Sequence, residues 1–211
     1  MEFSKKATYV RAIIYITFIY AGYDALLRLA DSRKLIMIYS RISGGILPMV
    51  VLYDDIFLVA ACLVIAFLFD KHAFVEALAV TNAWQLMLMA VGAVIFIAAA
   101  LKARPGNIID VYKIVHILVT LALLEEVVFR GVLYPWLRSI MPNSAACLIA
   151  GGAGGVLSGI NSVVVNDVSV TLTMLPLIIW GMLYGGMAAW VYGKTRSLWL
   201  VIYIHAAILL L

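Results

Sequence analysis

Residues 84–101 read WQLMLMAVGAVIFIAAAL, eighteen residues without a charged side chain. A helix needs about 20 predominantly apolar residues to cross the hydrocarbon of a bilayer. The whole chain has a similar character: of 211 residues, 66% are hydrophobic and 12% are charged, and the mean hydropathy is +1.11. Soluble domains carry about 45–50% apolar and about 25% charged residues. The composition therefore indicates an integral membrane protein in contact with the lipid bilayer. It excludes a soluble enzyme, a disordered chain and a nucleic-acid partner.

The apolar residues form unbroken runs between charged clusters. Spanning strands of a membrane barrel would alternate apolar and polar residues, so these runs predict helices. The runs lie at about 10–27, 42–69, 84–101, 114–137, 145–165, 171–192 and 198–211. We expect an all-α, polytopic integral membrane helix bundle with about six to eight transmembrane helices. No polar linker is long enough to divide the chain, so residues 1–211 are predicted to form a single domain of a multi-pass cell-membrane protein.

Glycines recur at helical spacing in the fifth and sixth runs. Gly151, Gly155 and Gly159 lie four residues apart, and so do Gly181 and Gly185. Small residues at this spacing let two helix backbones approach closely in lipid. The pattern predicts that the fifth and sixth helices pack tightly.

The fourth run carries a charged cluster within LALLEEVVFRGVLY, residues 121–134. Ionisable side chains inside a membrane helix cost about 2.5–3.5 kcal/mol or more each at mid-bilayer. On an α-helix, Glu126 and Arg130 lie on one face and can form a structural ion pair. Glu125 lies about 100° away, so we expect it to have no partner on its own helix and to be free to act as a general base. The alternative is a cluster at a helix end, exposed to headgroups.

Two further polar residues lie within apolar runs. His205 is in the middle of the last run, and Asn161 is near the end of the fifth. A lone membrane histidine is about as often a helix–helix hydrogen-bonding group as a catalytic one. Glu125, Asn161 and His205 could contact a cation, but asparagine is a poor zinc ligand. Cys62 and Cys147 share no motif and are interpreted as small buried hydrophobic residues. We expect no metal and no cofactor.

The cluster resembles the first motif of the CAAX-protease and bacteriocin-processing (CPBP, or Abi) family of intramembrane glutamic endopeptidases. That motif, Glu-Glu-x-x-x-Arg, stands here as Glu125, Glu126 and Arg130, followed by the frequent glycine at 131. The resemblance covers residues 121–211. It implies that Glu125 activates a water and that His205, in the family's last helix, stabilises the oxyanion.

Two positions depart from the family pattern. The second motif, Phe-x-x-x-His, aligns with Leu157 and Asn161, and the asparagine expected four residues after His205 is replaced by Leu209. An asparagine cannot act as a base, but its amide can orient a water or donate to an oxyanion. We therefore count Asn161 with Glu125 and His205 as candidate catalytic residues.

The resemblance implies an intramembrane endopeptidase that cleaves a peptide or a membrane-associated protein. The two departures keep a second hypothesis open, namely a catalytically impaired member that acts as a membrane scaffold, chaperone or immunity protein and binds a peptide or protein partner. A third hypothesis, a small transporter that uses Glu125 and Arg130 as a relay, lacks the inverted repeat typical of transporters.

Overall fold

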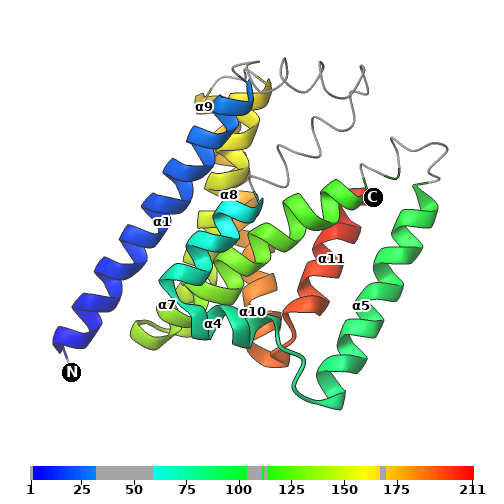
Figure 1. The fold of residues 1–211 in the computed structure, drawn as a ribbon, viewed down its shortest axis with the longest axis horizontal. Coiled ribbons are helices and arrows are strands. Elements are labelled where there is room, and N and C mark those ends of the chain that lie inside the picture. The colour runs from blue at the N-terminus through cyan, green and yellow to red at the C-terminus, as the bar shows by residue number, and fades with distance from the viewer. Residues whose placement is uncertain (1, 32–58, 104–110, 112–113, 167–169) are drawn as a thin grey trace.

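The computed structural model describes residues 2–31, 59–103, 111, 114–166 and 170–211. Every regular element within these ranges is a helix, as predicted (Figure 1). The elements, in chain order, are α1 (Glu2–Asp31), a helix Val59–Phe69, α4 (Lys71–Leu78), α5 (Ala83–Lys102), η1 (Ile117–Leu123), η2 (Glu126–Leu133), α7 (Tyr134–Ile140), α8 (Asn143–Asn166), α9 (Val170–Trp180), η3 (Gly181–Gly185), α10 (Gly186–Thr195) and α11 (Leu198–Leu210).

Two helical segments among the described residues are long and apolar enough to cross a membrane. They are α5 and the stretch Leu175–Thr195, which runs without interruption from α9 through η3 into α10. The helix Val59–Phe69 and α11 are apolar but shorter. Much of the second predicted run, residues 42–58, lies outside the described ranges. The count of six to eight transmembrane helices therefore stays a prediction.

The glycines of α8 form a close seam with α9 and η3. A Cβ atom built on Gly155 would overlap the carbonyl oxygen of Leu177, and one built on Gly151 would overlap that of Gly181. These overlaps are with backbone, so neither glycine can gain a side chain unless a helix moves. The tight packing predicted from the glycine spacing is confirmed at Gly151, Gly155 and Gly181.

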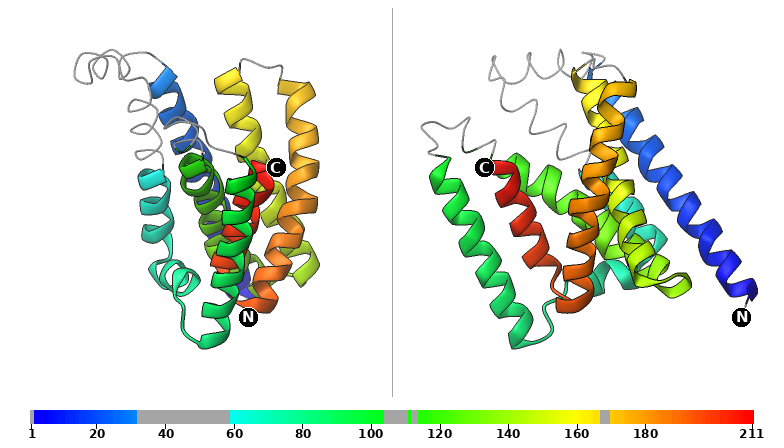
Figure 2. Two further views of the ribbon diagram at one scale, coloured as in Figure 1. Left: turned by 90° about the vertical axis from the view of Figure 1, so that its right-hand side faces the viewer. Right: turned by 180° about the vertical axis from the view of Figure 1, so that it is seen from behind.

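Side-chain hydrogen bonds fix the turns that bring α11 against α5. Asn82 caps α5 by accepting a bond from the amide of Gln85, and Ser197 caps α11. Arg196 ends α10 in the left-handed conformation, with φ of 55°, and its carbonyl oxygen accepts a bond of 2.8 Å from Gln85 Nε2. As a result, α11 lies between α5 and the rest of the bundle (Figures 1 and 2).

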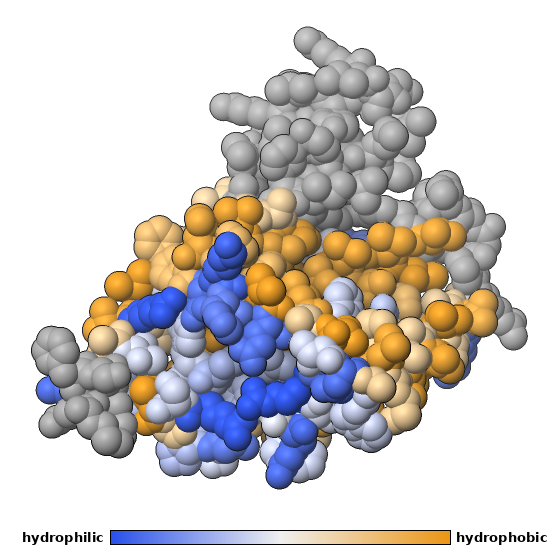
Figure 3. Space-filling model, turned by 60° about the horizontal axis from the view of Figure 1, so that its bottom comes forward, coloured by the Kyte–Doolittle hydropathy of each residue, from blue (hydrophilic) through white to orange (hydrophobic). Residues whose placement is uncertain are grey.

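Charged residues gather at the end of the bundle where α4, α7 and α10 have a terminus. Lys71, Arg138 and Lys194 are exposed there, and Figure 3 shows a hydrophilic band across this end with hydrophobic surface beside it. Away from this end, large hydrophobic side chains such as Val94 and Met187 are exposed. A polar end and apolar sides are what a protein in a bilayer presents.

Candidate active site

The fourth predicted helix is not a regular α-helix. Its segments η1 and η2 are π-helical, with hydrogen bonds between residues five apart, and Glu125 lies just before η2. Such segments are rare and frequently occur at functional sites. In this geometry residues four apart and residues five apart both lie on nearly the same face of the helix. Both Glu125 and Glu126 can therefore reach Arg130.

Arg130 contacts both carboxylates. Its Nη1 donates a hydrogen bond of 3.1 Å to Glu125 Oε1, and its Nε lies 3.3 Å from Glu126 Oε2. The expectation that Glu125 has no partner on its own helix is wrong, because it assumed α-helical geometry. The side chains of Arg130 and Glu126 are fully buried, whereas that of Glu125 is 15% exposed.

His205 reaches the same cluster from α11. Its Nδ1 lies 2.8 Å from Glu126 Oε1, and the residue is buried. The carboxylate of Glu126 therefore lies between Arg130 and His205. Because Nδ1 is engaged with Glu126, Nε2 is the ring nitrogen that remains for a ligand. A protonated His205 would balance the second carboxylate facing the single guanidinium of Arg130.

A cavity of about 250 Å³ opens beside this cluster. Its wall is formed by residues of α1, η1, α8, α9, η3 and α11. Leu124, between η1 and η2, also lines it. Its polar lining residues include Glu125 and His205, together with the hydroxyl side chains of Thr120, Ser158 and Tyr184. Glu126 and Arg130 lie behind this wall. The site thus places one carboxylate and one imidazole at a space large enough for several water molecules.

The family model described as type II CAAX prenyl endopeptidase Rce1-like matches residues 107–211. This chain belongs to the CAAX protease family. Members of the family are intramembrane peptidases. The comparisons with curated proteins and with solved structures gave no match. The resemblance inferred from the Glu-Glu-x-x-x-Arg motif is confirmed, and the match includes the whole of residues 121–211.

The second family motif falls at the far end of α8. Leu157 lines the cavity, and so does Ser158. Asn161 follows one turn later on the same helix, but its side chain lies outside the described part of the chain. Its catalytic role stays a prediction. Leu209, the other departure from the family pattern, lines the cavity.

Two glycines, Gly154 and Gly185, leave room for the charged side chains. This role was not identified from the sequence. A Cβ atom on Gly154 would overlap Glu125 Oε1, and one on Gly185 would overlap Arg130 Nη2. Gly154 belongs to the run GGAGG at 151–155. The glycine spacing predicts helix packing at Gly151 and Gly155, and the structure presents these two glycines to backbone and Gly154 to the Glu125 carboxylate.

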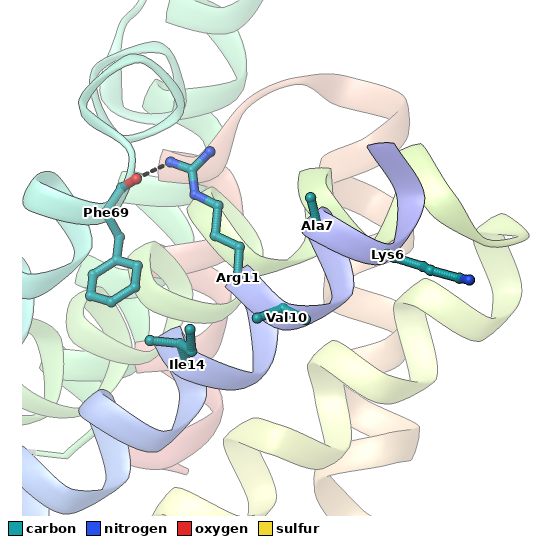
Figure 4. A pocket seen from close by; sticks show the side chains of 6 residues that line it. All are labelled: Lys6, Ala7, Val10, Arg11, Ile14 and Phe69. Atoms are coloured by element: carbon teal, nitrogen blue, oxygen red, sulfur yellow. Dashed lines mark hydrogen bonds between the residues drawn. The ribbon is translucent and has the colours of Figure 1, made fainter. Parts of the chain in front are cut away.

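A second hollow, of about 460 Å³, lies between α1 and the end of the helix Val59–Phe69 (Figure 4). Arg11 donates a hydrogen bond to the carbonyl oxygen of Phe69 at its edge. Its lining residues are Lys6, Ala7, Val10, Arg11, Ile14 and Phe69, with neither a carboxylate nor a histidine among them. This hollow therefore offers no general base. Among the described residues, no group of three His, Cys, Asp or Glu side chains is arranged to hold a metal ion.

Proposed function

We propose that this CAAX protease family member is an active intramembrane endopeptidase that uses Glu125 to activate water. The observation that carries the proposal is the convergence of Glu125 and His205 at one cavity, with Glu126 and Arg130 behind them. Ionisable groups at a shared, mostly buried cavity are the arrangement expected of a catalytic site.

Exposure and the number of charged partners separate the roles of the two glutamates. Glu126 is buried and both of its oxygens face a partner, namely Arg130 and His205. Glu125 lines the cavity, and in the described part of the chain only its Oε1 is hydrogen-bonded. Glu125 is therefore the carboxylate that can meet a water. Glu126 holds Arg130 and orients His205.

The reaction follows from these positions. A water in the cavity gives a proton to the Glu125 carboxylate as its oxygen attacks the carbonyl carbon of the peptide bond. The π electrons of the carbonyl move to its oxygen, which in our proposal receives a hydrogen bond from protonated His205 Nε2. The C–N bond then breaks, and the leaving amine takes the proton from Glu125. The products are a carboxylic acid and an amine, which exchange a proton to become a carboxylate and an ammonium group.

A peptide or a membrane-associated protein is the proposed substrate. The matched family is described as a prenyl endopeptidase acting on CAAX sequences, which supplies a probe. The assay uses protein reconstituted into vesicles with a synthetic peptide that carries a farnesylated CAAX tetrapeptide at its C-terminus. The same peptide without the farnesyl group, and a panel of unmodified membrane-associated peptides, are tested in parallel.

Glu125→Gln tests the proposed base. The amide cannot accept a proton from water, so the cleavage rate should fall by about 10²–10⁴-fold, as measured by mass spectrometry of the products. Glu76→Gln, an exposed carboxylate on α4, is the control and should cleave like wild type. In H₂¹⁸O the new carboxylate should carry one ¹⁸O atom. Absence of any Glu125-dependent product across all peptides would contradict the proposal.

Leu209 supports one alternative. An apolar side chain lines the cavity where the family pattern has an asparagine, which suits a protein that binds a segment without cleaving it. Such a scaffold, chaperone or immunity protein would retain an intact peptide, and Glu125→Gln would leave peptide binding nearly unchanged. Recovery of cross-linked, uncleaved peptide from both wild type and Glu125→Gln would favour this function.

A further inference from the structure

The hydroxyl group of Tyr184 has no hydrogen-bond partner among the described residues. The residue is 9% exposed. Buried hydroxyl groups are almost always hydrogen-bonded, because an unpaired one keeps its desolvation cost without a compensating bond. A phenylalanine would fill the same space without that cost. The unpaired hydroxyl therefore leaves a donor available for a partner that is not among the described residues.

Two aromatic side chains contact the Tyr184 ring. Trp180, one turn earlier, stacks on it with ring centroids 6.0 Å apart and planes 10° apart. His205 lies against it with centroids 4.8 Å apart. All three side chains line the cavity that contains Glu125. Tyr184 is thus a fixed side chain at the wall where a ligand would bind.

Tyr184 also lies where a side chain could stabilise the negative charge that develops on a substrate oxygen. It belongs to η3, the π-helical segment within the long apolar helix Leu175–Thr195. Its ring lies against His205, which contacts Glu126, and Glu125 lines the same cavity. A neutral O–H donor fixed among these charges needs no rearrangement to stabilise an anion.

We propose that Tyr184 is a catalytic residue whose hydroxyl donates a hydrogen bond to the scissile carbonyl oxygen as that oxygen becomes an oxyanion. The inference rests on the proposed peptidase function. The water proton goes to Glu125, and the carbonyl π electrons go to the oxygen that Tyr184 contacts. Those electrons re-form the C=O bond when the C–N bond breaks and the amine takes the proton from Glu125. Tyr184 keeps its own proton throughout.

The residues that line the cavity show why the oxyanion needs a second hydrogen-bond donor. His205 uses Nδ1 on Glu126, so one ring nitrogen remains for substrate. Leu209 lines the cavity but has no donor. Oxyanion sites in acyl transfer combine several donors. Tyr184 supplies the donor that Leu209 cannot.

Tyr184→Phe tests the inference in the vesicle assay with the farnesylated CAAX peptide. Removing one oxyanion donor should lower kcat by about 10²–10³-fold with little change in KM, and the melting temperature should stay at or above that of wild type. The matched control is Tyr192→Phe, a buried tyrosine of α10 that packs against Tyr134 and does not line the cavity. An unchanged kcat in Tyr184→Phe overturns the inference. A large loss of melting temperature also overturns it, because the hydroxyl would then have a structural partner.

A rescue variant separates donation from shape. Leu209→Asn in the Tyr184→Phe background restores an N–H donor to the cavity and should recover part of the lost kcat. No recovery overturns the role as a donor. If wild type gives no product with any peptide, the peptidase proposal fails together with this inference. If wild type and Tyr184→Phe cleave equally while Glu125→Gln does not, only the inference about Tyr184 fails.

Discussion

Arg130 determines the electrostatics of the candidate site. Its guanidinium is fully buried and lies between the carboxylates of Glu125 and Glu126, and Glu126 in turn contacts His205. A buried ion has a desolvation cost of several kcal/mol unless partners compensate for it. One arginine therefore allows two carboxylates to remain in the interior, where one of them faces the cavity.

Arg130→Ala should destabilise the protein strongly. The change leaves Glu125 and Glu126 close together without the guanidinium, and breaking a buried ion pair costs about 3–5 kcal/mol. The measurement is the free energy of unfolding in detergent or, where unfolding is irreversible, the melting temperature. Arg138→Ala, an exposed arginine of α7, is the control and should change stability little. Equal melting temperatures for Arg130→Ala and wild type would show that water solvates the cluster.

At the scale of elements, α8 performs two tasks with adjacent glycines. Gly155 lies against the backbone of α9, which cannot yield locally, whereas Gly154 lies against the end of the flexible Glu125 side chain. A methyl group therefore has different consequences at the two positions. One change acts on helix packing and the other on the proposed base.

Gly155→Ala and Gly154→Ala should accordingly separate stability from activity. Gly155→Ala should lower the melting temperature, because α8 must move away from Leu177. Gly154→Ala should leave it near the wild-type value, since alanine favours a helix by about 1 kcal/mol over glycine, but it should lower peptide cleavage by displacing the Glu125 carboxylate. Thermal unfolding and the vesicle assay provide the two readouts. The same loss of melting temperature in both variants would refute this division.

The elements also differ in how well the sequence predicts them. Charged or polar residues flank the apolar run at 84–101, and the structure has α5 at Ala83–Lys102. In contrast, all eight residues of η2 are buried. Eight buried residues are too few for the spacing of hydrophobic positions to distinguish a π-helix from an α-helix. The pairing of Glu125 with Arg130 could not be predicted for that reason.

The sequence likewise predicts some residues of the candidate site and not others. Glu125, Glu126, Arg130 and His205 stand out because charged or titratable groups are costly within apolar runs, and the structure brings them together. Tyr184 gives no such signal, because tyrosine is common among apolar residues. Its unpaired hydroxyl is a property of packing between η3 and α11, which the local sequence does not encode.

At the scale of the whole molecule, Asp70 joins three parts of the chain at the polar end of the bundle. Its Oδ1 accepts a bond of 2.9 Å from the amide of Ala73 and caps α4, and its Oδ2 accepts one of 2.8 Å from the indole of Trp136 in α7. Arg11 of α1 lies 3.6 Å from Oδ2 and stacks over the Trp136 ring. This contact connects the N-terminal helix, which lies outside the matched residues 107–211, to the half that carries the site.

Asp70 should make the stability of the bundle depend on acidic pH. Burial by itself raises the pKa of the Asp70 carboxyl, but the bonds from Ala73 and Trp136 and the charge of Arg11 outweigh it and hold the pKa below its usual value. The carboxylate therefore contributes stability in full above its unfolded pKa of about 3.9. That contribution is lost as the pH falls through the lower pKa of the folded state.

Asp70→Asn isolates this charge, because asparagine caps a helix about as well as aspartate. Wild type should melt at a higher temperature than the variant at pH 7. The difference should shrink as the pH falls below the unfolded pKa, since the wild-type carboxyl becomes neutral as well. The measurement is the melting temperature of both proteins in one detergent, from pH 7 to pH 3. The other acidic groups titrate alike in wild type and variant, so they cancel in the difference. A difference that stays constant over this range would mean that the hydrogen bonds of Asp70, and not its charge, hold α1 and α7 together.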